Sequence, residues 1–431
     1  MGSRLIIEGG TPLKGTLEAS GAKNACLPIM AASILAQGQV ELERVPNISD
    51  VRVMASILDK IGVKVEFDAQ AGHMLLDSSE LTTTRAPEDL VRRMNASFDV
   101  MGPLLARCGH GEVSMPGGCR LGPRPVNYHI EAFRKLGAEV KVEGGFVKAQ
   151  AKRLKGAHII FPAVSVGATK NAMMAATMAE GTTILEGCAR EPEISDLANF
   201  LIKMGAKISG VGSQTLRIEG VEKLHGAKHS IIADRIEGCT YLIGAAMTQG
   251  DLTIDKFEAE YSAAFLAQLE KAGQEVIVGE HYVRVKGRRP ILPLEIATSP
   301  YPGFPTDLHP QIVALLSIAN GVSALAETIF DSRFMYVMEL VRLGADLLAS
   351  GKYVRIRGVE QLVGAPVDAP DIRAGGALVM AGLAAQGETI IRGVKYIDRG
   401  YQKLEQNLRS LGAKIERVEE PLKELDQVPF Q

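Results

Sequence analysis

The sequence predicts a two-domain α/β protein built from six copies of a β-α-β-α-β-β unit, and two sets of spaced glycines carry this prediction. The first set stands between a helix end and a strand start, at Gly62, Gly137, Gly205, Gly273, Gly344 and Gly412. Successive members are 75, 68, 68, 71 and 68 residues apart. The second set, expected to end another helix in each copy, is Gly38, Gly111, Gly181, Gly250, Gly321 and Gly387. Two markers that keep step along a chain indicate an internal repeat.

The elements of the first copy follow from local chemistry. A helix is expected to end at Gly38, because glycine readily adopts the left-handed conformation that terminates helices. Residues 39–42 form a short strand, and Ser49 or Asp50 is expected to cap the next helix. Apolar residues recur there at i, i+3, i+7 and i+10 from Val51, which places them on one helix face. An alternating strand over 63–67 and a return strand complete the unit.

The N-terminus supplies a missing strand. The sixth copy reaches residues 414–418 without its closing strand, while residues 5–9 resemble residues 216–220 of the third copy. We therefore predict that residues 1–21 complete the sixth copy. Six units of about 70 residues fit two domains of three units, over 22–233 and over 1–21 with 234–431. Two chain crossings favour a hinge and a ligand cleft between the domains.

Composition excludes several classes of function. The 431 residues contain 48 Lys and Arg against 50 Asp and Glu, so the net charge of −2 gives no general attraction to nucleic acid or membrane surfaces. No apolar run reaches the ~18–20 residues of a membrane span, and the first residues lack a signal-peptide pattern. Five cysteines without a Cys-x-x-Cys pair argue against a disulfide framework and a zinc site. We expect a cytoplasmic protein.

The first helix of every copy begins with polar residues. If the repeat holds, these helix starts are equivalent in space, and their free N–H groups and dipoles attract anions. Ser, Thr and Asp at such positions are ordinary caps. Lys23 and Arg373 are not, because a cation there opposes the helix dipole. An anionic ligand beside them would remove that conflict. The six starts lie at 20–24, 94–97, 165–169, 234–237, 304–307 and 371–373.

A loop rich in Gly and Pro over 115–125 carries a cysteine. Cys119 is followed by Arg120 and Arg124 on a segment that is expected to act as a surface lid. A positive surrounding and solvent access lower the pKa of a thiol and raise its reactivity, so Cys119 is a candidate for chemistry. The other cysteines lie in apolar contexts typical of small buried residues: Cys26, Cys108, Cys188 and Cys239.

Seven motifs in a fixed order make the chain resemble a known family. They are Lys23-Asn24, residues 116–119 with Arg124-Pro125, 165–169, 190–194, 304–307, 371–373 and 397–401. Together they resemble the UDP-N-acetylglucosamine branch of the enolpyruvyl transferase family, along essentially the whole chain. The resemblance implies an inside-out α/β barrel of two domains, each with three units and its helices inside.

The resemblance also implies a reaction. The enolpyruvyl group of phosphoenolpyruvate passes to the 3′-hydroxyl of UDP-N-acetylglucosamine by addition and elimination, and phosphate is released. This is the first committed step of peptidoglycan synthesis, on which cell wall biogenesis, cell shape and cell division depend, and it is the step blocked by fosfomycin. Neither a metal nor an organic cofactor is implied. We expect a monomer with no nucleic acid or membrane partner.

Residue roles carry over by matching motifs. Cys119 would donate a proton and form an adduct with phosphoenolpyruvate, and Asp307 would accept the hydroxyl proton. Lys23 and Arg399 complete the catalytic set. The residues expected around phosphoenolpyruvate are Lys23, Asn24, Cys119, Arg124 and Arg399. Those expected around the nucleotide sugar are Asn24, Asn95, Arg124, Pro125, Val126, Asn127, Tyr128, Ser165, Val166, Gly167, Asp307 and Ile329. Asp371 and Arg373 would complete the wall contributed by the second domain.

One departure and two alternatives stay open. The family usually has arginine where this chain has Asn95, so a fixed charge is absent from that contact. One alternative function is the enolpyruvyl transfer to shikimate 3-phosphate, and the other is a non-catalytic repeat scaffold that binds an anion. Cys119 and the Ser165 motif favour the sugar nucleotide over shikimate 3-phosphate. A scaffold leaves Cys119 and the dipole-opposing Lys23 unexplained.

Overall fold

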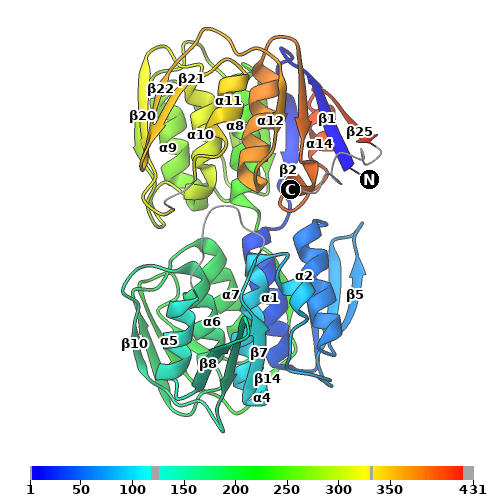
Figure 1. Cartoon of the computed structure of the whole chain (residues 1–431), viewed down its shortest axis with the longest axis vertical. Helices are drawn as coiled ribbons and strands as arrows, with labels where there is room; N and C mark the ends of the chain where they lie inside the picture. The colour runs from blue at the N-terminus through cyan, green and yellow to red at the C-terminus, as the bar shows by residue number, and fades with distance from the viewer. Residues whose placement is uncertain (1, 118–125, 331–332, 421–431) are drawn as a thin grey trace, which may run out of the picture. The chain divides into compact units, whose positions relative to one another are not determined.

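The structure, a computed structural model, describes residues 2–117, 126–330 and 333–420 and divides into two compact units (Figure 1). The first unit contains the described residues from Ser20 to Asp234. The second contains those up to Ala19 together with those from Arg235 onward. Among the described residues, no helix combines the length and the apolar character that a bilayer crossing requires.

Most sheets in the described residues share one pairing pattern, in which a parallel edge pair is followed by two antiparallel pairs. In the first unit these are β15(Lys228–Ser230)-β4(Gln39–Glu43)-β6(His73–Asp77)-β5(Lys64–Asp68) and β10(His158–Ile160)-β11(Thr182–Glu186)-β13(Thr215–Glu219)-β12(Lys207–Ser209). In the second unit they are β2(Lys14–Glu18)-β16(Asp251–Asp255)-β18(Tyr282–Lys286)-β17(Glu275–Val278), β19(Glu295–Ala297)-β20(Val322–Ala326)-β22(Tyr353–Arg357)-β21(Asp346–Ser350) and β23(Pro366–Asp368)-β24(Glu388–Arg392)-β1(Gly2–Glu8)-β25(Lys414–Glu420).

Two sheets of the first unit differ from this pattern. The sheet β7(His110–Ser114)-β9(Phe146–Gln150)-β8(Glu139–Glu143) has three strands, and a single parallel bridge between Arg85 and Glu112 replaces its edge strand. A short parallel pair joins β14(Leu224–His225) to β3(Ala36–Gln37).

The N-terminal strand completes the last sheet, as the sequence predicts. β1 lies between β24 and β25 and is antiparallel to both, with Leu5 opposite Ile391 and Ile7 opposite Ile415. Leu5 and Ile7 are fully buried, so the alternation of residues 5–8 fits the single apolar face of this sheet.

Helices fill the interior of each unit. In the second unit, α8(Arg235–Met247), α10(His309–Leu316) and α12(Ile372–Ala384) pack against one another side by side (Figure 1), and every residue of α8 and α10 is buried. Because these helices are surrounded by protein, they have no solvent-facing side and are only weakly amphipathic. The corresponding buried helices of the first unit are α1(Lys23–Ala32), α4(Met101–Cys108) and α6(Val166–Ala176).

The remaining helices are amphipathic or short. The amphipathic ones are α2(Ser49–Lys60), α5(Asn127–Lys135), α7(Pro192–Lys203), α9(Ala263–Lys271), α11(Val337–Arg342) and α14(Leu404–Ser410). The short ones are α3(Glu88–Val91), α13(Val394–Ile397), and the 3-10 turns η1(Ser33–Leu35), η2(Asn95–Val100), η3(Ala259–Ser262) and η4(Thr306–Leu308).

The first set of glycines is confirmed as helix termini. Each lies two residues beyond the last residue of α2, α5, α7, α9, α11 or α14. Their φ angles lie between +85° and +105°, where a side chain is strained and glycine is not. The helix-to-strand turn therefore repeats six times in the described residues with one backbone geometry.

The second set of glycines does not end helices as expected. α1 stops at Ala32, continues as η1 and leads into β3, so Gly38 lies between two strands. Arg107 donates to the carbonyl oxygens of Ile34 and Ala36 at 2.7 and 3.0 Å, and these bonds satisfy helix-end acceptors that a glycine turn would otherwise serve. Gly111 lies within β7.

The expected cap of α2 is also wrong. Ile48 occupies the cap position, and no side chain there accepts a backbone hydrogen bond. Asp50 lies in the first turn and points its carboxylate to Lys23 instead. The predicted apolar face is correct, since Val51, Met54 and Leu58 are fully buried.

Candidate active site

The helix starts in the described residues include two side-chain caps. Ser165 precedes α6, and its Oγ accepts the N–H of Ala168 at 3.2 Å. Asp371 precedes α12, and its Oδ1 accepts the N–H groups of Arg373 and Ala374 at 2.8 and 3.0 Å. These bonds confirm the capping interpretation of both residues. Asn95 instead opens the 3-10 turn η2 and is half-buried.

Lys23 opens α1 and has carboxylates as partners. Its Nζ lies 3.3 Å from Oδ2 of Asp50, and its side chain is 12% exposed against 3% for Asp50. Its backbone N–H donates to Oδ2 of Asp234 at 3.1 Å. Asp50 from α2 thus compensates the unfavourable interaction between Lys23 and the dipole of α1. From the sequence, this compensation is expected to come from an anionic ligand. Asn24 follows in α1 and is half-buried.

Asp307 in the second unit is held by two arginines. Oδ1 lies 3.0 Å from Nη2 of Arg333, and Oδ2 lies 3.2 Å from Nη2 and 3.3 Å from Nε of Arg373. Both guanidinium groups are buried, while the carboxylate of Asp307 is 29% exposed. The negative charge of Asp307 therefore compensates the unfavourable interaction between Arg373 and the helix dipole. Arg333 was missed at the sequence level, because no motif or spacing links it to Asp307.

The buried Glu327 supports the cluster formed by Asp307, Arg333 and Arg373. Glu327 accepts hydrogen bonds from the hydroxyls of Thr298 and Thr306 at 3.0 and 2.8 Å, and Thr306 in turn accepts one from Nη1 of Arg333 at 2.8 Å. Glu327 also accepts the N–H of Ile329 at 2.8 Å, which leaves the Ile329 side chain partly exposed. These bonds connect the segment around Ile329 to η4.

Aromatic and histidine side chains close the interior side of the cluster. The guanidinium carbon of Arg373 lies 5.9 Å from the ring centre of Tyr401, whose hydroxyl is within 3.2 Å of Thr240. Burial raises the pKa of Tyr401, so the phenol stays protonated. Burial and the Arg333 charge hold the pKa of His309 well below its usual range. Arg399 follows α13 and is half-buried.

Predicted nucleotide-sugar residues of the first unit lie on elements that pack together. Val126 precedes α5, and Asn127 and Tyr128 are its first two residues. Val166 and Gly167 are the first two residues of α6, which contacts both α5 and η2. The structure thus brings these helix starts into one neighbourhood within the unit. Cys119, Arg124 and Pro125 lie outside the described residues, and their roles stay predictions.

Three of the four cysteines that the structure describes are buried, as the sequence predicts, and the fourth is only half-buried. Burial raises the pKa of the Cys26 thiol far above its usual range and that of Cys188 to about 12. Cys239 is fully buried and Cys108 is half-buried. Within residues 2–117, 126–330 and 333–420, no three His, Cys, Asp or Glu side chains are arranged to hold a metal ion.

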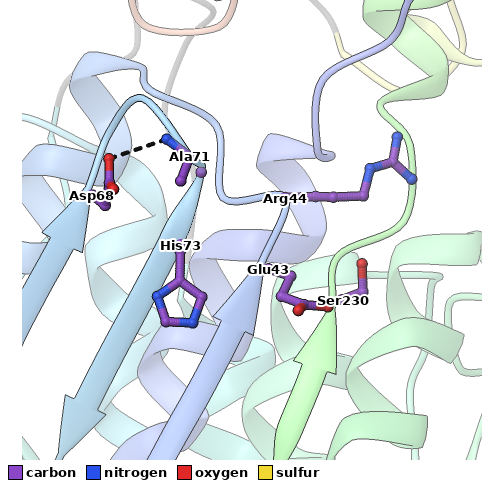
Figure 2. Close-up of a pocket in the computed structure, with 7 residues that line it drawn as sticks. Glu43, Arg44, Asp68, Ala71, His73 and Ser230 are labelled. Atoms are coloured by element: carbon purple, nitrogen blue, oxygen red, sulfur yellow. Dashed lines mark hydrogen bonds between the residues drawn. The ribbon is translucent and has the colours of Figure 1, made fainter.

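Two pockets lie away from the predicted site residues. Figure 2 shows the one in the first unit, where Glu43 of β4 and His73 of β6 flank a loop in which Asp68 accepts the N–H of Ala71 at 3.1 Å. That hydrogen bond and the one from Gln70 lower the pKa of Asp68. The other pocket lies at the ends of α8, α10 and α12 in the second unit. Neither is lined by a residue of the predicted site.

Sequence comparisons identify relatives along nearly the whole chain. The family model described as EPSP synthase (3-phosphoshikimate 1-carboxyvinyltransferase) matches residues 7–408. A UDP-N-acetylglucosamine 1-carboxyvinyltransferase of Magnetococcus marinus is 48% identical over 416 residues, covering 96% of this chain and 99% of the relative. A protein of the same name from Xanthobacter autotrophicus is 49% identical over 425 residues, with the same shares covered.

Solved structures share the mixed α/β fold. The enolpyruvyl transferase NikO from Streptomyces tendae matches with a TM-score of 0.87 at 26% identity, covering 98% of this chain and all of its own. An EPSP synthase from Acinetobacter baumannii matches with a TM-score of 0.76 at 17% identity, covering 97% of this chain and all of its own. The second likeness concerns the fold alone.

Proposed function

Because the chain belongs to the enolpyruvyl transferase family, we propose that it transfers the enolpyruvyl group of phosphoenolpyruvate to the 3′-hydroxyl of UDP-N-acetylglucosamine and releases phosphate. One observation carries the choice of acceptor: relatives named for UDP-N-acetylglucosamine are nearly half identical over almost their entire length. The likeness to the 3-phosphoshikimate enzyme of known structure is at 17% identity. The reaction belongs to peptidoglycan synthesis, and its substrates favour a cytoplasmic enzyme, which we further propose to be a monomer.

The reaction has two steps, an addition and an elimination. In the addition, the sugar oxygen bonds to C2 of phosphoenolpyruvate, C3 gains a proton and the hydroxyl loses one. In the elimination, the C2–O bond to phosphate breaks, phosphate leaves with the electron pair of that bond, and C3 gives a proton back to the enzyme, so that the C2=C3 double bond forms again. Cys119 donates the proton to C3, a role for an acid of suitable pKa within hydrogen-bond reach. Cys119 also forms the covalent adduct with phosphoenolpyruvate and the one with fosfomycin.

Asp307 accepts the proton of the sugar hydroxyl. Its geometry supports this role, because Arg333 holds one carboxylate oxygen and Arg373 the other. Two charge-assisted contacts fix the plane of the carboxylate before a substrate arrives, and preset orientation of this kind lowers reaction barriers. Since the carboxylate is partly exposed while both arginines are buried, a hydroxyl can approach Asp307 from solvent.

The remaining predicted residues bind the two substrates. Lys23, Arg124 and Arg399 hold the phosphate and carboxylate of phosphoenolpyruvate, and arginine offers paired donors for such groups. Asp371 and Arg373 form the wall contributed by the second unit. The nucleotide sugar contacts Asn24, Asn95, Arg124, Pro125, Val126, Asn127, Tyr128, Ser165, Val166, Gly167, Asp307 and Ile329.

The architecture behind these roles is a sixfold repeat in an inside-out α/β barrel. The domains are residues 22–233 and residues 1–21 with 234–431, each with three units. The shared strand order of five sheets and the single parallel bridge of a sixth support this count within the described residues. The repeated left-handed glycine after six amphipathic helices supports it independently.

A phosphate-release assay with two acceptors tests the function. The protein receives phosphoenolpyruvate with either UDP-N-acetylglucosamine or shikimate 3-phosphate. We expect release with the nucleotide sugar and none above background with shikimate 3-phosphate. The reverse preference would establish the shikimate alternative, and no release with either acceptor would favour the scaffold that binds without catalysis.

A further inference from the structure

Four buried polar side chains in the first unit form a cluster that the proposed roles do not use. They belong to the buried residues Asp99, His129, Lys170 and Asn171. Charged and polar groups that lose water must regain partners inside the protein. The hydrogen-bond and ion-pair partners of these four side chains therefore show which helices the cluster connects.

Lys170 and Asn171 tie α6 to η2 and α4. Nζ of Lys170 lies 2.6 Å from Oδ2 of Asp99 in η2. The Asn171 amide donates from Nδ2 to the carbonyl oxygen of Phe98 at 3.3 Å and accepts, at Oδ1, the N–H of Gly102 at 2.8 Å. The N–H of Gly102 can only donate, which fixes the orientation of the amide. Three contacts thus set the register of α6 against its neighbours.

His129 ties α5 to the same helix. Its Nδ1 lies 3.1 Å from Nδ2 of Asn171. Because an amide NH₂ can only donate, Nδ1 accepts, and the ring proton of the neutral imidazole lies on Nε2. Burial and the charge of Lys170 lower the pKa of His129 to about 3, so the ring stays neutral at physiological pH.

The far edge of the same ring meets the second residue of α6. A Cβ placed on Gly167 would lie 2.9 Å from Nε2 of His129, closer than Cβ atoms approach other atoms in proteins, and in a tight contact of 3.1 Å with Cε1. Glycine is therefore the residue that lets the start of α6 rest on the imidazole. The ring spans the gap between two helix starts, since Asn127 and Tyr128 directly precede it in α5.

We propose that His129 is a positioning residue for the nucleotide sugar, acting through Gly167 and Asn171 rather than by touching substrate. Its ring sets the separation between the start of α5 and the start of α6, which carry predicted nucleotide-sugar residues. The Asp99–Lys170 pair holds η2, which begins at Asn95, in the same frame. This inference rests on the proposed function. A displacement of about 1 Å at such positions lowers the efficiency of an enzyme by up to ~100-fold.

A double-mutant cycle tests the spacing. Gly167→Ala pushes the helix starts apart and His129→Asn removes the spacer while keeping an acceptor for Asn171. We expect each single variant to raise KM for UDP-N-acetylglucosamine about tenfold, with KM for phosphoenolpyruvate unchanged. In the double variant the added methyl fills part of the space left by the ring, so KM lies closer to wild type than in either single variant. Independent effects would multiply instead, to about 100-fold.

Controls separate the possible failures. His158→Asn changes an exposed histidine of the same unit and leaves both KM values unchanged. If the wild-type protein does not use UDP-N-acetylglucosamine, the proposed function fails. If it does, but His129→Asn has a wild-type KM for that substrate or the double variant shows the multiplied effect, the positioning role is refuted while the function stands. Should Gly167→Ala not fold, His129→Asn decides by itself.

Discussion

Replacing Lys170 by methionine would leave the buried carboxylate of Asp99 without its positively charged partner. Nζ of Lys170 lies 2.6 Å from Asp99, and the two side chains are 10% and 4% exposed. Methionine keeps most of the length of the lysine stem, so packing changes little while the charge is lost. Removing one partner of a buried ion pair costs about 3–5 kcal/mol, because the other charge is left without compensation. We expect a loss of this size at neutral pH in the free energy of unfolding of the first unit.

The loss depends on pH in a definite direction. Burial raises the pKa of Asp99, and Lys170 opposes that rise. Without Lys170 the folded protein therefore binds a proton at a higher pH than the unfolded chain, whose aspartate titrates near its usual value of about 3.9. The folded state then gains stability as pH falls, by up to about 1.4 kcal/mol per pH unit between these two pKa values. Lys170→Met should be closer to wild type at pH 5.5 than at pH 7.5.

Urea unfolding followed by circular dichroism measures both effects. The variants are Lys170→Met and the double change Lys170→Met with Asp99→Leu, which removes both charges and should recover most of the stability. Lys141→Met is the matched control, since Lys141 pairs with Glu139 at 2.7 Å on the surface and should change stability little. A Lys170→Met variant as stable as this control, or equally destabilised at both pH values, would refute the reasoning.

Two further predictions concern the chemistry. Asp307→Asn keeps the shape of the side chain that Arg333 and Arg373 hold but removes the proton acceptor, so kcat for phosphate release should fall about 10²–10⁴-fold; near-normal release would exclude Asp307 as the base. Cys119→Asp should retain turnover, because a carboxylic acid also delivers protons, and should lose alkylation by fosfomycin; mass spectrometry that finds the wild-type adduct on another cysteine would contradict the assignment.

Features that depend on neighbouring residues could be predicted from the sequence. The left-handed glycines after α2 and α5, the caps Ser165 and Asp371 and the buried face of α2 each follow from spacing within about one or two helical turns. The position of β1 followed from a different signal, the similarity between two copies of the repeat.

Partners from distant segments could not be predicted. Asp50 reaches Lys23 across 27 residues, and Lys170 reaches Asp99 across 71. A single sequence carries no signal that links such pairs, because any acidic residue on a suitable face would serve. The path of the chain after α1 is a similar case, since the side chain of Arg107 from another helix donates to the carbonyl oxygens of Ile34 and Ala36.

The position of β1 in its sheet means that this strand is synthesised long before the strands with which it pairs. β1 lies at one end of the described residues, and both of its neighbours, β24 and β25, lie at the other end. At about 5–20 residues per second, the roughly 380 residues between them take about 20–80 s to be made. Until β24 is made, both edges of residues 2–8 lack a partner strand, whereas the first unit has all its described strands as soon as β15 has been made. Nascent chains of this protein therefore expose an apolar strand that a chaperone, or another nascent chain, can capture.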